Sequence, residues 1–345
     1  MSQITDNQIE LFKQIAEIVE TARKSVVRTT NSTMVTTYYL VGMRIVEHEQ
    51  AGEIRAQYAK RILSSLSKQL KERFGKGFSV DNLENMRRLY LTYSISENGF
   101  RKLQIIDNKS INTPLFTLSW SHYLILCRIK NEDERRFYEI EATQNDWNLD
   151  ELQRQYDVSL YERLALSTDK AKVWELAQNG QLIKQPRDLI KDPYILEFLG
   201  LNEKPDYSEN DLETAVINQL ETFMLELGKG FFFGGRQVRF TFDEKHFFVD
   251  LVFFNRLLKC FVLLDLKIGE LKHQDLGQMQ MYVNYYDRFV KARDENPTIG
   301  IIVCKDKNEA IIEITLPKDN TQIFASQYQL YLPSKEELKQ LIEEK

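Results

Sequence analysis

Two apolar stretches, Phe247–Phe254 and Cys260–Lys267, follow each other with a short polar turn between them. Such runs are typical of strands buried in a sheet, and their spacing predicts an antiparallel hairpin. Asp250 interrupts the first stretch, and Asp265 and Lys267 interrupt the second. A charge buried without a partner is costly, so these three side chains need a chemical reason to stand in a core strand.

The spacing of the two aspartates predicts that they meet. In a hairpin without a bulge, a turn centred between Leu257 and Leu258 places Asp250 directly opposite Asp265, with Cβ atoms roughly 4.5–5.5 Å apart. Lys267 lies two residues further on and shares that face of the strand. Two carboxylates so close repel each other unless a proton or a cation lies between them. We therefore expect a hard divalent cation, Mg²⁺ with Mn²⁺ as an alternative, bound by oxygen ligands.

Within such a site the lysine could orient or help to deprotonate the attacking water, or offset charge that develops on a phosphate. The alternative is that the three charges lie on a solvated face of a half-exposed hairpin. The continuous apolar run 261–264 argues against this alternative, because it is typical of a central strand buried on both sides.

Three further side chains are candidates for the same site. Gln278 and Tyr282 stand four residues apart in the expected helix Gln274–Arg293 and share one of its faces, where an amide and a hydroxyl could contact water or a phosphate. Glu213 begins the expected helix Leu212–Leu227 and could complete a metal shell. Acidic residues also favour helix N-termini for dipole reasons alone, so both interpretations of Glu213 stay open.

A change of periodicity divides the chain of 345 residues, which is long enough for two domains. Up to about residue 200 the apolar residues recur at helical spacing. The expected helices are Ile4–Thr29, Tyr38–Glu49, Ala56–Phe74, Asn82–Tyr93, Ser119–Ile129, Glu132–Gln144, Leu149–Arg163 and Leu182–Ile190. The polar segment LNEKPDYSEN, 201–210, is the expected linker.

After the linker the expected elements have the order α-β-β-β-α-β, which implies a mixed sheet flanked by helices. Besides the hairpin and the two helices already named, the expected strands are Phe231–Thr241 and Ile299–Cys304. The prediction is therefore an all-α domain over 1–200, an α/β domain over 211–335 and a helical tail over 336–345.

The stretch from Glu53 to Leu103 is locally basic, and a helix, a glycine-containing turn and SVDNLENMRRLYLTY resemble a helix-turn-helix. The second helix would contact DNA, and the candidate DNA-binding residues are Lys76, Asn82, Asn85, Arg87 and Arg88. A helical scaffold or a dimerisation surface with solvated lysines explains the same pattern equally well.

Bulk composition excludes several classes of protein. The net charge of −5 and a pI near 5.7 mean that nucleic-acid binding must come from local patches. The three scattered cysteines form neither a disulfide framework nor a zinc cluster. The chain has no signal-peptide core, no apolar run long enough to span a membrane, no P-loop and no G-x-S-x-G motif. A reduced, cytoplasmic setting without membrane contact is expected.

The segments LETAVINQLETFMLELGKGFFFGGRQ, VDLVFFNRLLKCFVLLDLKIG and GQMQMYVNYYD resemble the YhcG-like family of the PD-(D/E)XK nuclease superfamily, and TLSWSHYLILCRIKNEDERRFYEIEA resembles the helical domain of that family. The resemblance implies a restriction-endonuclease-like fold and Mg²⁺-dependent cleavage of nucleic-acid phosphodiesters. It makes Asp250 and Asp265 metal ligands, Lys267 the catalytic lysine and Glu213 the helix carboxylate. Val249 replaces the nominal proline of the motif, and Asp265 replaces the usual glutamate.

The leading hypothesis is therefore a metal-dependent DNA endonuclease that acts in genome defence or DNA processing, with the N-terminal helices holding DNA. One alternative is a catalytically silent DNA-binding or complex-assembly module, and another is an RNA-directed nuclease. Because cutting both strands of a duplex suits a pair of active sites, a homodimer is also expected.

Overall fold

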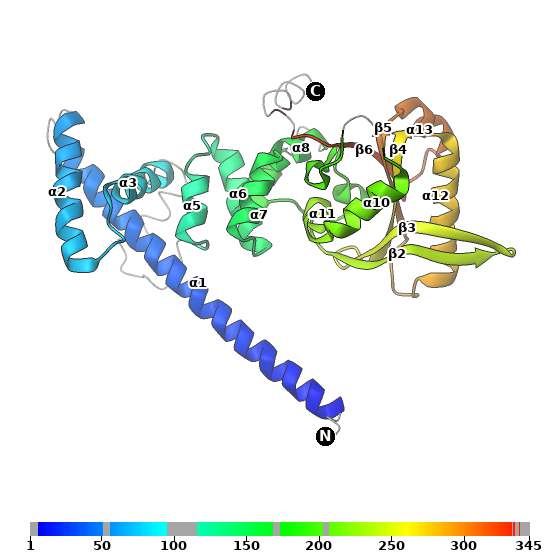
Figure 1. The fold of residues 1–345 in the computed structure, drawn as a ribbon, viewed down its shortest axis with the longest axis horizontal. Coiled ribbons are helices and arrows are strands. Elements are labelled where there is room, and N and C mark those ends of the chain that lie inside the picture. Colours follow the sequence, from blue (N-terminus) through cyan, green and yellow to red (C-terminus); the bar gives the residue numbers. More distant parts are fainter. Residues whose placement is uncertain are drawn as a thin grey trace. The chain divides into compact units, whose positions relative to one another are not determined.

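The computed structural model describes residues 6–50, 56–94, 116–167, 173–202 and 207–332, together with Ser334 and Leu338. The chain divides into two compact units, Met1–Leu152 and Gln153–Lys345, each of which is described by itself (Figure 1). Across these described ranges, no helix is long and apolar enough to cross a membrane.

The N-terminal unit is helical throughout its described part, as the sequence predicted. Its helices are α1 (Asp6–Gln50), α2 (Ala56–Phe74), α3 (Val80–Ser94), α5 (Trp120–Leu126) and α6 (Glu132–Gln144), and α7 (Leu149–Asp157) begins in this unit.

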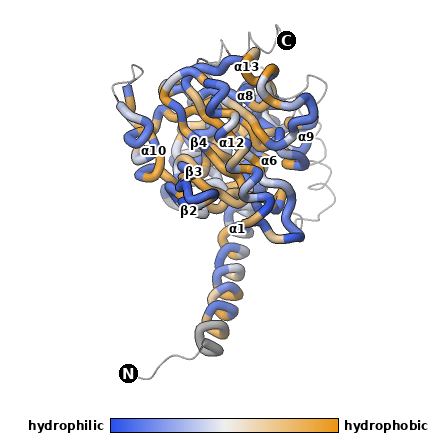
Figure 2. Tube along the Cα trace, turned by 90° about the vertical axis from the view of Figure 1, so that its right-hand side faces the viewer, coloured by the Kyte–Doolittle hydropathy of each residue, from blue (hydrophilic) through white to orange (hydrophobic). Residues whose placement is uncertain are grey.

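Helix α1 is continuous, where the sequence suggested a break after Thr29. The hydroxyls of Thr29, Thr33 and Thr37 each donate to the carbonyl oxygen four residues earlier, at 2.9 Å, so these β-branched residues are accommodated inside the helix. In the first half of α1 the apolar side chains are exposed, among them Phe12 at 72% and Ile18 at 68%. Apolar and polar residues alternate around this part of the helix (Figure 2).

Helices α1 and α3 pack closely at Gly42. A Cβ atom on Gly42 would lie 2.0 Å from the backbone oxygen of Met86, which is far inside van der Waals contact. The side chains around this point, Tyr38, Ile45 and Leu83, form the buried core of the unit. The absence of a side chain at Gly42 therefore sets the distance between the two helices.

We expect Gly42→Ala to destabilise the N-terminal unit by about 1–3 kcal/mol, because the helices must move apart. The intrinsic helix preference of alanine, worth about 1 kcal/mol, acts in the opposite direction. Gly277→Ala is the matched control, since a Cβ atom there would meet nothing within 4 Å, and it should be neutral or stabilising. Urea unfolding followed by circular dichroism measures both variants, and equal stability would contradict the steric argument.

The C-terminal unit is built on a six-stranded mixed sheet with the order β1-β6-β5-β4-β3-β2. Its strands are β1 (Tyr194–Ile195), β2 (Phe231–Phe242), β3 (Lys245–Asn255), β4 (Cys260–Glu270), β5 (Ile299–Asp306) and β6 (Ile323–Gln329). The pairs β2/β3 and β3/β4 are antiparallel, and β4, β5, β6 and β1 run parallel.

Helices cover both faces of this sheet (Figure 1). On one face, α10 (Glu209–Asn218) and α11 (Leu220–Leu227) pack on a core that includes Leu264 and Leu266. On the other face, α12 (His273–Tyr285), which continues as a π-helix over Tyr286–Val290, packs on a core that includes Leu263 and Ile302. Alternate residues of β4 are therefore buried on opposite sides, as a central strand requires. The remaining helices are α8 (Leu160–Ser167), α9 (Val173–Asn179), α13 (Glu309–Thr315) and the 3₁₀ turn Glu197–Leu199.

Three further expected helices differ from the structure. Leu182–Ile190 is wrong, because only Pro186–Leu189 forms a 3₁₀ turn and the residue before the proline is extended. Leu149–Arg163 is interrupted at Ser159, whose φ of 51° is incompatible with a right-handed helix, so α7 and α8 are separate. Leu212–Leu227 is likewise divided into α10 and α11.

The two compact units also divide earlier than the linker that the sequence suggested at 201–210. A buried ion pair ties the intervening helices to the sheet: Arg163 Nη1 and Nη2 donate to Glu226 Oε1 and Oε2 at 2.6 and 3.2 Å, and both side chains are 0% exposed. The Ile195 N–H donates to Glu226 Oε1 at 2.9 Å. Apart from Leu338, the expected tail 336–345 lies outside the described residues.

Candidate active site

Strands β3 and β4 form a fork whose mouth carries the two aspartates. Their pairing runs from Asn255 opposite Cys260 to Leu251 opposite Leu264, which is the register that the sequence predicted. Asp250 and Asp265 are the next residues outward, where this ladder stops and β4 stays paired only with β5.

At this point the Asp250 side chain takes the place of a backbone acceptor for a hydrogen bond between the two strands. The backbone N–H of Leu266 donates to Asp250 Oδ2 at 3.0 Å. A carboxylate of β3 thus satisfies a β4 amide that would otherwise need a backbone acceptor. The Asp250 side chain is held toward β4, beside Asp265.

Asp265 and Lys267 form an ion pair just beyond the end of the β3/β4 pairing. The Lys267 ammonium lies 2.9 Å from Asp265 Oδ2 and 3.5 Å from Glu209 Oε2 of α10. Asp265 is 3% exposed, so its carboxyl is almost completely removed from water. The three side chains that the sequence singled out are therefore brought together.

Burial and the neighbouring charges shift the pKa values of Asp265 and Lys267. Burial, followed by the carboxylate of Asp250, raises the pKa of Asp265 from 3.8 to about 7, although Lys267 acts in the opposite direction. Burial alone would lower the pKa of Lys267, but Asp265, Glu209 and Asp250 outweigh it and raise the pKa above its usual value. Lys267 is therefore charged at neutral pH, and burial together with the charge of Asp250 favours the protonated form of Asp265.

Gln237 links Asp250 to Glu213 of helix α10, a contact that local sequence patterns do not predict. Its side-chain amide donates to Asp250 Oδ1 at 3.0 Å and also to Glu213 Oε2. Glu213, only 3% exposed, also pairs with Arg236. The backbone of Gln237 is left-handed, with φ of 47°, and this turns the residue out of the regular β2 ladder.

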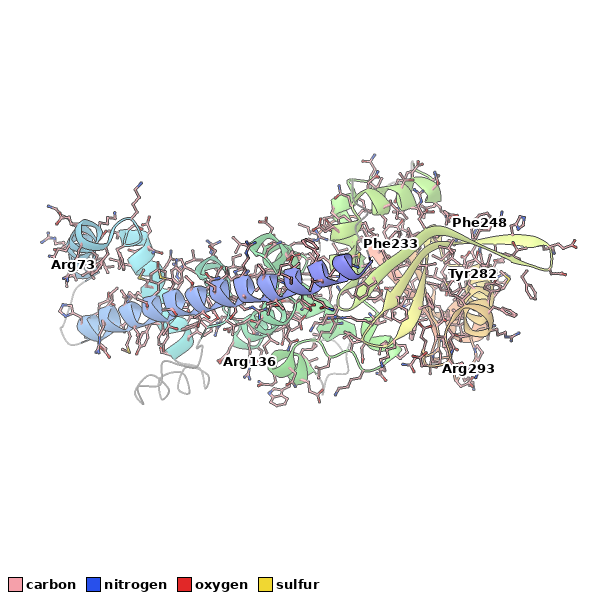
Figure 3. All side chains as sticks on the ribbon, turned by 90° about the horizontal axis from the view of Figure 1, so that it is seen from below. Arg73, Arg136, Phe233, Phe248, Tyr282 and Arg293 are labelled. Atoms are coloured by element: carbon pink, nitrogen blue, oxygen red, sulfur yellow. The ribbon has the colours of Figure 1, made fainter. Side chains whose placement is uncertain are left out.

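Helix α12 supplies the last pair of predicted residues. The Gln278 amide donates to the Tyr282 hydroxyl, which confirms that they share one face of the helix. Tyr282 is 1% exposed and lies at the end of the sheet that carries the hairpin (Figure 3). Burial and the charges of Asp265 and Asp250 raise the pKa of Tyr282, against the effect of the Gln278 hydrogen bond. The tyrosine therefore stays neutral and lies within the electrostatic reach of the carboxylates.

Known proteins resemble this chain over most of its length. Residues 187–343 match a family model described as the YhcG PDDEXK nuclease domain, and residues 14–163 match one described as the DUF1016 N-terminal domain. The Escherichia coli (strain K12) protein named "Putative nuclease YhcG" is 39% identical over 346 residues, which cover 95% of this chain and 92% of that protein. The chain belongs to the YhcG family of PDDEXK nucleases.

A more distant likeness concerns a solved structure. The crystal structure of a repair endonuclease from Pyrococcus abyssi matches 37% of this YhcG-family chain and 50% of its own chain, with 19% identity and a TM-score of 0.25. At that score the likeness is too distant to describe the fold.

In the helical part of this YhcG-family protein, the five predicted DNA-binding residues have different surroundings. Lys76 and Arg88 are exposed, and Asn85 is half-buried. Arg87 Nε donates to Glu49 Oε2 of α1 at 2.6 Å. Asn82 donates to the Gly77 carbonyl and accepts from Trp120 Nε1 at 3.0 Å, so its amide holds the turn before α3 and α5 together. Only Lys76 and Arg88 therefore present their charges to solvent without such a contact among the described residues.

The raised pKa of Asp265 gives a prediction for the YhcG-family protein in EDTA. Between about pH 4 and pH 7 the folded protein keeps the Asp265 proton that the unfolded chain has lost, so rising pH favours unfolding. This loss is on the order of 4 kcal/mol when complete. Asp265→Asn should remove it, so the variant should gain stability over the wild type as the pH rises through this window.

Urea unfolding of both proteins at a series of pH values measures this gain. Carboxylates that do not interact with Asp265 contribute equally to both proteins and cancel in the difference. A difference in unfolding free energy that stays constant from pH 4 to pH 7 would show that Asp265 titrates normally.

Proposed function

We propose that this YhcG-family nuclease is a metal-dependent endonuclease that hydrolyses phosphodiester bonds of DNA, with Mg²⁺ as its cofactor and Mn²⁺ as a substitute. The observation that carries the proposal is the convergence of Asp250, Asp265 and Lys267 at the β3/β4 fork. Two acidic oxygen donors beside a charged lysine suit a cation and a phosphate, and they do not suit an apolar ligand.

The donor set fits a divalent cation. Burial, followed by the charge of Asp250, raises the pKa of Asp265 to about 7, and a bound cation would offset the repulsion between the two carboxylates. Asp250 and Asp265 would hold the ion, which when bound activates water and neutralises charge on the phosphate. Glu213 is already engaged by Arg236 and Gln237, so we propose that it orients Asp250 through Gln237. Within the described ranges no cluster of three or more His, Cys, Asp and Glu side chains is arranged to hold a metal.

Lys267 provides a positive charge and a hydrogen-bond donor to the site. Because its pKa is raised, it keeps its proton at neutral pH and cannot accept one from water. Its ammonium instead orients the attacking water and offsets negative charge that develops on the phosphate. Gln278 and Tyr282 position the substrate on the α12 side of the fork.

The helical N-terminal unit would hold DNA through α3 and the turn before it, with Lys76 and Arg88 as the exposed cations. A homodimer would supply the two active sites that a double-strand cut needs. Cleavage of a single strand needs neither the DNA-holding helices nor a second subunit. Genome defence and DNA processing are the two cellular roles that suit such an enzyme.

Conversion of supercoiled plasmid to nicked and linear DNA tests the proposal. We expect products with Mg²⁺ or Mn²⁺ and none with EDTA. Lys267→Ala should reduce the rate at least about a hundredfold, because it removes the charge that faces the phosphate. Lys318→Ala, an exposed lysine outside the site, is the matched control and should cut at the wild-type rate.

RNA and single-stranded DNA of the same sequence are tested in parallel. If the protein cleaves RNA and neither form of DNA, the substrate is RNA. Binding of nucleic acid that persists in EDTA, without cleavage under any metal, would contradict the enzyme and favour a silent binding module.

A further inference from the structure

A cavity of about 370 Å³ lies between the outer side of α12 and the end of strand β2. Its walls come from two chemical classes of residue. The aromatic ones include Phe240, Phe242, Tyr285 and Phe289, and the polar ones are Gln280, Asn284 and Arg288. A volume of this size is in the range of small-ligand sites.

The aromatic wall is partly open to solvent. Phe240 stacks on Tyr285 with ring centroids 4.1 Å apart and planes inclined by 23°. Phe242 and Phe289 are 54% and 64% exposed, although both line the cavity. Exposed rings that face a cavity offer flat apolar surface to a ligand at no further cost in desolvating polar groups.

The polar wall is a row along one side of the helix. Gln280, Asn284 and Arg288 are spaced four residues apart, so they project from adjacent turns. All three side chains are exposed, and within the described ranges no hydrogen bond holds any of them to another residue. Two amides that both donate and accept, together with a guanidinium, suit a ligand with donors, acceptors and a negative charge.

The cavity adjoins the candidate active site through Phe240, which lines the cavity and contacts Tyr282. The rings of Tyr282 and Phe240 form a T-shaped pair, with centroids 5.5 Å apart and planes inclined by 88°. Tyr282 feels the charges of Asp250 and Asp265, and Phe240 lines the cavity. A ligand in the cavity would therefore lie next to the reacting phosphate of a bound substrate.

We infer that this cavity binds an unpaired nucleobase of the nucleic acid that the enzyme cuts, an inference that rests on the proposed function. A base has two π faces for the aromatic wall and an edge of donors and acceptors for Gln280 and Asn284. Arg288 faces the neighbouring phosphate. Bases inside a duplex cannot enter without being flipped out, so the preferred substrate is single-stranded or carries an unpaired nucleotide at the cut.

The test measures binding of the full-length protein in EDTA to an oligonucleotide that carries 2-aminopurine, whose fluorescence falls when it stacks on an aromatic ring. We expect quenching with the single strand and much less with the same sequence as a duplex. Phe242→Ala and Phe289→Ala should each weaken binding of the single strand roughly tenfold to a hundredfold and reduce the quenching.

Phe248→Ala is the matched control, because Phe248 is 45% exposed on the same hairpin but does not line the cavity (Figure 3). It should leave quenching unchanged. The inference is overturned if the cavity variants behave like Phe248→Ala, or if the wild type shows no quenching. It is also overturned if AMP alone binds as tightly as the single strand, because the ligand would then be a free nucleotide.

This experiment separates the two proposals. Quenching that depends on Phe242 and Phe289, in a protein that cuts no nucleic acid, would support base binding in the cavity and contradict the nuclease activity. Cleavage of single-stranded DNA at the same rate by the wild type and the cavity variants would support the nuclease activity and contradict base binding in the cavity.

Discussion

Asp250→Asn is expected to slow phosphodiester cleavage at least about a thousandfold, which corresponds to roughly 4 kcal/mol of activation free energy. Asparagine has nearly the same shape and keeps an oxygen that can accept the Leu266 N–H, so the fork should stay intact. What is lost is a negative charge, half of the acidic pair that would hold the cation, and the second acceptor oxygen, which accepts from the Gln237 amide in the wild type. Single-turnover cleavage of plasmid at saturating Mg²⁺ measures the loss.

Asp243→Asn is the control for this variant. Asp243 is exposed in the turn of the same hairpin, with φ of 49°, a conformation that asparagine also tolerates. It should cut at the wild-type rate. Thermal unfolding of Asp250→Asn should agree with the wild type within a few degrees. A folded Asp250→Asn protein that cuts normally would show that Asp250 does not take part in the reaction.

Glu226→Gln is expected to destabilise the C-terminal unit by about 3–5 kcal/mol. The change leaves the shape of the side chain and removes its charge, so the buried guanidinium of Arg163 loses its counter-ion. Burial alone would raise the pKa of Glu226, but Arg163 and Lys191 outweigh it and hold the pKa below its usual value. The carboxylate is therefore ionised in the folded protein, and its charge contributes to stability.

Urea unfolding followed by circular dichroism measures the loss of unfolding free energy. Two further variants serve as comparisons. Arg163→Met/Glu226→Leu removes both charges and should recover part of the loss, since the guanidinium no longer stays buried without its counter-ion, while the buried Lys191 still loses the Glu226 charge. Arg44→Met breaks an ion pair whose side chains are 76% and 47% exposed, and it should cost less than about 1 kcal/mol. Equal losses for Glu226→Gln and Arg44→Met would contradict the importance of burial.

The hairpin and its charges could be predicted from the sequence because the necessary information is local. The distance in sequence between Asp250 and Asp265 fixes the register, and strand alternation places Lys267 beside Asp265. The Gln278–Tyr282 contact follows from helical spacing in the same way.

Other features depend on contacts between distant residues, and local patterns do not reveal them. Gln237 matters because a left-handed backbone directs its amide between Glu213 and Asp250, and glutamine has no sequence signature for this. Strand β6 contains polar Ser326 and Gln327, which bond to Asp192 in the preceding part of the unit, so the strand lacks an apolar pattern. The short strand β1 consists of two residues and is below the length that periodicity can detect.

The ion pair between α8 and α11 also affects how relatives of this protein can be recombined. Arg163 is the last residue matched by the helical family model, whereas Glu226 belongs to the part matched by the nuclease model. A chimera joined between the two matched stretches takes these residues from different parents, so it will fold only where both parents carry a compatible pair. A nuclease fragment that begins at 187 would contain Glu226 and lack Arg163. The separable piece begins before α7, where Gln155 also donates to the Leu225 carbonyl at 3.0 Å.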